Sequence, residues 1–134
     1  ILQKGCERMK IQEAAENYLE EVLMVSKKQG HVRQTDICAA MNYSRPTVSV
    51  ALRELAGEGY LDIDEGGYIT LTDKGHSIAD RIYERHCVIA RVLMAIGTSE
   101  DTAYKDACKI EHDISDESFE NLKKHYDDIR KFIK

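Results

Sequence analysis

The apolar residues in the first half of the chain recur at the spacing of helices. Between residues 11 and 25 a stripe with helical spacing consists of Ile11, Ala14, Ala15, Tyr18, Val22 and Val25. Lys27, Lys28 and Gly30 indicate where this first helix ends. Thr35 is a favourable N-cap for a second, short helix. A third stripe has the i, i+3, i+4, i+7 spacing of one helix face and consists of Val48, Ala51, Leu52 and Leu55. Two short helices joined by a turn of three or four residues form the helix-turn-helix pattern.

The pattern changes to alternation in the stretch "YLDIDEGGYITLTDKG", residues 60–75. Apolar and polar residues alternate on both sides of a glycine pair, which predicts a β-hairpin with a Gly-rich turn. A helix-turn-helix followed directly by a hairpin is typical of a winged helix. The turn, residues 64–67, is acidic, so we expect the wing tip to avoid phosphates and the affinity for DNA to rest mostly on the helix.

Helical spacing returns after the hairpin and continues to the end of the chain. The starts of three helices are indicated by Thr72, by Thr98 with Asp101 in a capping box, and by Ser115. The last apolar stripe alternates spacings of three and four, which suits packing against another helix of this chain or of a partner subunit. The sequence therefore predicts a mainly α protein, with a winged helix-turn-helix domain over residues 9–74 and an all-helical domain over residues 75–134.

Composition narrows the class of protein. The 134 residues are 43% apolar and 32% charged, as in a soluble globular protein, and no apolar run approaches the roughly 18 residues of a membrane span. The four cysteines are scattered without a Cys-x-x-Cys pair, and no secretory signal opens the chain, so we expect free thiols in the cytoplasm. Met9 is a plausible native start, which makes residues 1–8 a candidate non-native or disordered segment.

The charge distribution favours a localised contact with DNA. The net charge is −5, but residues 26–60 carry five Lys and Arg against three Asp and Glu. Residues 98–134 carry seven against ten. A mildly basic segment within an acidic protein suits specific binding to double-stranded DNA. The outward face of the third helix could reach phosphates and base edges, although an ordinary polar face fits the same pattern; its residues are Arg45, Pro46, Thr47, Ser49, Val50 and Arg53.

A second group of polar residues has the chemistry of metal ligands. In "DACKIEHDIS", residues 106–115, Cys108, Glu111 and His112 stand at i, i+3 and i+4, on one face of a helix. By itself this pattern is more often a half-buried Cys beside two solvated residues. His86, beside an apolar stripe, is by itself more often a core or interface residue. Asn17 and Glu20 stand three apart and project away from the apolar stripe of the first helix, like many solvated pairs.

The chain as a whole resembles the diphtheria toxin repressor family of iron- and manganese-dependent bacterial transcription regulators. The likeness is carried by "ENYLE" (16–20), "SRPTVSVALREL" (44–55), "YLDIDEGGYITLTDKG" (60–75), "ERH" (84–86), "GTSEDTAYKDACKIEHDIS" (97–115) and "FENL" (119–122). The resemblance implies a homodimeric winged-helix repressor that binds operator DNA when loaded with a divalent metal, through a helical dimerisation and metal-binding domain. The implied metal ligands are Asn17, Glu20, His86, Cys108, Glu111 and His112. The implied DNA contacts lie around Ser44, Arg45, Thr47 and Ser49.

The sequence departs from the family pattern at three places. Asn17 stands where iron-sensing members have Met and manganese-sensing members have Asp. Ala90 and Tyr104 stand where the iron-sensing branch has Glu and His in its second metal site, and we expect a two-domain form without an SH3-like domain. The thiolate of Cys108 favours borderline ions whereas carboxylates suit Mn(II) or Fe(II). We therefore expect Mn(II) or Fe(II), with Zn(II) or Co(II) binding in vitro.

These patterns support a mechanism and leave one alternative open. A metal bound by ligands of both domains would fix the winged-helix domain relative to the dimerisation domain. This would favour the conformation in which the two recognition helices of the dimer match the spacing of the operator half-sites. The alternative is a winged-helix regulator that senses oxidation through Cys108 or Cys87. An enzyme is not expected, since the sequence has neither a His-Glu-x-x-His pairing nor a nucleophile–base set. We also expect no membrane and no small organic ligand among its partners.

Overall fold

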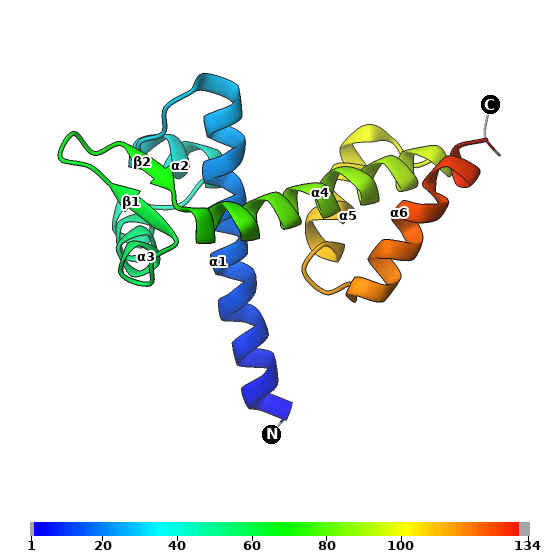
Figure 1. The fold of residues 1–134 in the computed structure, drawn as a ribbon, viewed down its shortest axis with the longest axis horizontal. Coiled ribbons are helices and arrows are strands. Elements are labelled where there is room, and N and C mark those ends of the chain that lie inside the picture. The colour runs from blue at the N-terminus through cyan, green and yellow to red at the C-terminus, as the bar shows by residue number, and fades with distance from the viewer. Residues whose placement is uncertain (1, 132–134) are drawn as a thin grey trace. The chain divides into compact units, whose positions relative to one another are not determined.

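The computed structural model describes residues 2–131, and the side chains of residues 12–128 and 131. Its elements in chain order are α1 (Leu2–Gln29), α2 (Gln34–Met41), α3 (Arg45–Gly57), β1 (Leu61–Ile63), β2 (Ile69–Leu71), α4 (Asp73–Ala95), α5 (Glu100–Ile110) and α6 (Asp116–Lys131) (Figure 1). The structure confirms a mainly α protein in which a winged helix-turn-helix precedes a helical region. Contacts within the chain divide it into unit 1 (Ile1–Asp80) and unit 2 (Arg81–Lys134).

The division falls inside α4, whereas the sequence pattern placed the domain boundary after residue 74. The first turn of α4 belongs to unit 1 because it is tied to the loop before β1. Thr72 Oγ1 donates to the carbonyl of Gly59 at 2.6 Å, and Lys74 Nζ donates to the carbonyl of Glu58 at 2.9 Å. Gly75 lies so close to Tyr60 that an added Cβ would stand 1.9 Å from the Tyr60 carbonyl oxygen. The start of α4 is therefore anchored to the loop between α3 and β1.

The helix-turn-helix of unit 1 is built from α2 and α3. Asn42 ends α2 in the left-handed conformation, with φ of 57°, and Ser44 caps α3 by accepting a hydrogen bond from the Thr47 N–H at 3.4 Å. Pro46 occupies the first turn of α3, where its missing N–H is not needed. The buried faces of the two helices consist of Ile37, Val48, Leu52 and Leu55. Burial on this side leaves the opposite face of α3 exposed.

The structure corrects two predicted N-caps. Arg33, not Thr35, is the N-cap of α2, and the Asp36 carboxylate accepts from the Arg33 N–H at 2.8 Å. Ser99, not Thr98, is the N-cap of α5. In both cases the helix begins one or two residues from the expected position. Arg33 is not a favourable N-cap side chain, so cap chemistry by itself could not locate the start of α2.

The buried face of α1 also differs from the expected stripe. Its buried apolar residues are Tyr18, Leu19, Val22 and Leu23, while Ala14 is exposed; Ile11, part of the expected stripe, has a side chain outside the described residues. Glu20, expected to project toward solvent, is only 5% exposed. The pattern missed this because α1 packs against α2, α3 and β2, so that a wide face of the helix is covered.

The wing is an antiparallel hairpin with the register Leu61↔Leu71, Asp62↔Thr70 and Ile63↔Ile69. Gly67, with φ of 85°, completes its turn, which the Asp64 side chain closes by accepting from the Tyr68 N–H at 2.9 Å. Beside this turn, the guanidinium of Arg33 lies 4.2 Å from the centre of the Tyr68 ring. The expected hairpin is thus present, and a basic side chain stands beside its acidic turn.

Unit 2 is a helical core formed by the second part of α4 with α5 and α6. Ile89 and Ala90 of α4 pack with Ala107 of α5, joined by the partly buried Leu93, Met94 and Ile114. Ser115 caps α6 as predicted, since its hydroxyl accepts from the Ser118 N–H at 3.1 Å. In the part of the chain that the structure describes, no helix has both the length and the apolar character that crossing a membrane requires.

Candidate metal centre

Three of the predicted metal ligands meet in unit 2. His86, Cys108 and Glu111 each offer one ligand atom, and these atoms all lie within 4.8 Å of one another. His86 Nδ1 is 2.9 Å from Glu111 Oε2, and Cys108 Sγ is 3.7 Å from the same nitrogen. The three residues come from α4, from α5 and from the residue just after α5. The cluster is therefore assembled by tertiary packing between segments that are distant in the sequence.

The helix that carries Cys108 ends earlier than its sequence pattern suggests. α5 stops at Ile110, Glu111 is its C-cap, and His112 lies in the following turn, so the three residues do not share one helix. Glu111 nevertheless keeps near-helical dihedral angles of −57° and −27°, which preserve its direction relative to Cys108. His112 stays beside the cluster, with its Nε2 3.3 Å from Glu111 Oε1.

Burial and charge make this cluster unlike an ordinary surface group. The Glu111 side chain is fully buried, at 0% exposure, and His86 is 7% exposed. Hydrogen bonds with the Cys108 thiol and the Glu111 carboxylate raise the pKa of His86 to about 11, against the opposing effect of burial. The imidazole thus holds a proton between two groups that are anionic when they ligate a metal.

The donor set fits a divalent transition-metal ion. Imidazole nitrogen, thiolate sulfur and carboxylate oxygen are all ligands of such ions, and the mixture of soft and hard donors suits Fe(II), Co(II), Zn(II) or Mn(II). Cys108 is exposed to solvent, whereas His86 and Glu111 are buried. The Tyr104 ring lies 5.4 Å from the His86 ring and covers one side of it.

The remaining predicted ligands, Asn17 and Glu20, lie on α1 in unit 1. Asn17 is half-buried and lines a small hollow with Tyr18 and Tyr43. Glu20 is buried. A buried carboxylate is costly unless it has partners, and its burial sets Glu20 apart from the solvated positions of α1.

The predicted DNA-contacting residues gather on one end and one face of α3. Ser44, Arg45, Pro46, Thr47 and Arg53 are exposed, and Ser49 is half-buried. Arg53 Nη2 donates to Ser49 Oγ at 3.3 Å, which directs the guanidinium along the outward face. The hydroxyls of Ser44 and Thr47 are 2.8 Å apart at the helix start. This arrangement leaves hydroxyl and guanidinium groups available to a nucleic acid.

Sequence reasoning missed one residue at this site, Arg85. It is 5% exposed, and it reaches the turn that carries Glu111 and His112. The sequence feature that could have indicated Arg85 is its position directly before His86, beside the apolar stripe of the same helix.

Family models match both halves of the chain. The family model described as "Iron dependent repressor, N-terminal DNA binding domain" matches residues 10–68, and that described as "Iron dependent repressor, metal binding and dimerisation domain" matches residues 72–131. The transcriptional regulator MntR of Escherichia coli O6:H1 is 31% identical over 108 residues, covering 81% of this chain and 70% of that protein. An HTH-type regulator of Methanocaldococcus jannaschii is 33% identical over 113 residues, covering 83% and 90%.

Solved structures of metal-dependent transcription regulators have a similar fold. The manganese regulator SloR superposes with a TM-score of 0.74 at 28% identity, over 84% of this chain and 53% of that one. A manganese-dependent transcriptional repressor in complex with manganese has a TM-score of 0.76 at 26% identity, over 84% and 52%. The chain therefore spans about half the length of these solved relatives.

Proposed function

The chain belongs to the iron-dependent repressor family, and we propose that it is a homodimeric repressor whose affinity for operator DNA rises when Fe(II) or Mn(II) binds to unit 2. The family consists of DNA-binding transcription regulators, not enzymes. Redox sensing through Cys108 or Cys87 has no support from these relatives, whose names refer to metals and to transcription. We assign DNA reading to residues 9–74 and dimerisation with metal binding to residues 75–134.

The observation that supports this proposal most is the convergence of His86, Cys108 and Glu111. These three residues would hold a divalent ion, whose positive charge would stabilise the thiolate and the carboxylate, and His86 would bind it as the neutral imidazole. Glu111 orients His86 through the 2.9 Å contact and remains buried. Its second oxygen faces His112 at 3.3 Å, which makes His112 the fourth candidate ligand of this unit.

Asn17 and Glu20 complete the proposed ligand set from unit 1. Glu20 would add a carboxylate, and Asn17 an uncharged carbonyl oxygen. A ligand set drawn from both units would couple metal binding to the position of the DNA-reading helix. Such couplings are usually about 1–3 kcal/mol, or roughly 5–150-fold in affinity, and operator DNA would tighten metal binding by the same factor.

DNA recognition is assigned to the outward face of α3. Arg45 and Arg53 would contact phosphates or base edges, and Ser44, Pro46, Thr47 and Ser49 would let the backbone approach the groove. We expect the protein to act in the cytoplasm as a dimer on double-stranded operator DNA, without a membrane or a small organic ligand.

The test is metal-dependent binding to promoter DNA, followed anaerobically by fluorescence anisotropy with Mn(II), Fe(II), Zn(II) or a chelator. A metal should raise the affinity tenfold or more, and His112→Ala should abolish the gain. His125→Ala is the matched control, because His125 is exposed on α6 and pairs with the nearby Asp128, at 3.6 Å. Equal affinity in chelator and in every metal would refute the proposal. Glu20→Gln and Asn17→Ala, measured in parallel, test the unit 1 ligands separately.

A further inference from the structure

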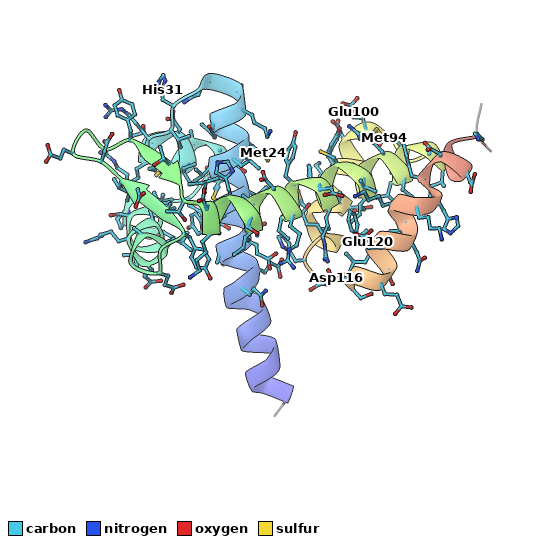
Figure 2. The ribbon with its side chains drawn as sticks, viewed as in Figure 1. Met24, His31, Met94, Glu100, Asp116 and Glu120 are labelled. Carbon is cyan, nitrogen blue, oxygen red and sulfur yellow. The ribbon has the colours of Figure 1, made fainter. Side chains whose placement is uncertain are left out.

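Arg85 is a buried cation that none of the functions above uses. It directly precedes His86 on α4 and is 5% exposed. Its Nη1 donates to the carbonyl of Glu111 at 3.2 Å and to the carbonyl of Ile114 at 2.7 Å. Its Nη2 is paired with the carboxylate of Asp116. Asp116 lies at the start of α6 (Figure 2).

These contacts converge on the turn between α5 and α6. The last carbonyls of a helix have no partner within the helix, so they need donors from elsewhere. Arg85 supplies donors to two carbonyls at the end of α5 and in the turn, and its planar fork lets one side chain also hold the start of α6. The turn it fixes, residues 111–114, carries Glu111 and His112.

Glu111 is thereby held from both ends by two successive residues of α4. Arg85 binds its main-chain carbonyl, and His86 meets its carboxylate at 2.9 Å. The backbone and the side chain of one proposed ligand are thus located by the helix that bears another. We propose that Arg85 is a positioning residue of the metal centre, which sets the turn so that the Glu111 carboxylate faces His86; this inference rests on the proposed function.

The charge of Arg85 would by itself oppose a cation nearby. The paired Asp116 balances this charge, and two carbonyl dipoles point toward the guanidinium. The arrangement therefore keeps the geometric benefit of the Arg85 fork while limiting its repulsion of a bound ion.

The test compares Arg85→Gln and Arg85→Lys with Glu84→Gln in the 134-residue chain. Glu84 is the matched control because it is exposed on the same helix, where it pairs with Lys123 on the surface. Metal-free protein is titrated anaerobically with Co(II). The thiolate-to-Co(II) charge-transfer band and the d–d bands report which atoms bind the ion, and circular dichroism reports folding.

We expect both Arg85 variants to fold, to bind Co(II) about 10–100-fold more weakly than the unsubstituted chain, and to show altered d–d bands. Glu84→Gln should match the unsubstituted chain in affinity and spectrum. Unchanged affinity and spectrum in Arg85→Gln and Arg85→Lys would overturn the inference. Loss of helical dichroism in both would also overturn it, because Arg85 would then hold the fold rather than the site. An unsubstituted chain that binds no Co(II) would instead refute the proposed function.

Discussion

Substituting Glu111 by Gln tests the cluster at its most buried member. The change keeps the shape of the side chain and removes only its charge. In the structure this carboxylate is fully buried, with one oxygen 2.9 Å from His86 Nδ1 and the other 3.3 Å from His112 Nε2. The amide of the substituted side chain can accept through one oxygen only, so it cannot serve both imidazoles as an acceptor.

The expected loss of stability and of metal affinity in Glu111→Gln follows from these contacts. Removing one partner of a buried ion pair costs about 3–5 kcal/mol. Because His86 can lose its proton once the carboxylate is gone, we expect the lower end of that range, about 3 kcal/mol, for the metal-free protein near neutral pH. The variant also loses an anionic ligand. Metal affinity should therefore fall by at least the roughly 10–100-fold that is typical for partners outside the ligand set.

Two assays separate these effects. Urea unfolding in chelator, followed by circular dichroism, gives the free energy of unfolding of the metal-free protein, and calorimetric titration with Mn(II) gives the metal affinity. Asp113→Asn is the matched control, because it removes an exposed carboxylate two residues further along. The reasoning would be refuted if the free energy of unfolding of Glu111→Gln lay within about 0.5 kcal/mol of that of the unsubstituted chain and both bound Mn(II) equally well. The buried pair would then contribute no stability, and Glu111 would not be a metal ligand.

Three further predictions concern pH, DNA and packing. Because its hydrogen bonds raise the pKa of His86 from 6.5 to about 11, the stability it contributes is complete below pH 6.5 and is lost as the pH rises toward 11. Between about pH 7 and 9 the free energy of unfolding of the metal-free protein should fall by up to about 1.4 kcal/mol per pH unit, and a flat urea-unfolding profile would contradict this. Arg53→Gln should weaken operator binding by about 1–3 kcal/mol in anisotropy titrations while nonspecific DNA binding stays nearly constant; an equal loss on both DNAs would exclude a base contact. Gly75→Ala should destabilise the protein by about 1–3 kcal/mol, since its Cβ would stand 1.9 Å from the Tyr60 carbonyl oxygen, whereas Gly57→Ala, with no atom within 4 Å, should be tolerated in the same unfolding assay.

The sequence by itself determined the elements whose signals are local. The stripe of Val48, Leu52 and Leu55 marks the buried face of α3, and alternation around Gly66 and Gly67 marks the wing. Spacings of about 3.6 and 2 residues are properties of a single segment, so they can be recognised before any packing is known. The same holds for the Ser115 cap, whose hydroxyl accepts from the N–H of Ser118 three residues away.

Only the tertiary structure decided which polar residues are buried and which of them meet. Sequence spacing grouped Cys108 with Glu111 and His112, but α5 ends before the last two, and the partner of Glu111 is His86, 25 residues earlier. Periodicity shows which face of a helix is apolar, and it does not show what covers the other faces. The burial of Glu20 and the reach of Arg85 to the turn after α5 depend on such covering elements, and these are distant in sequence.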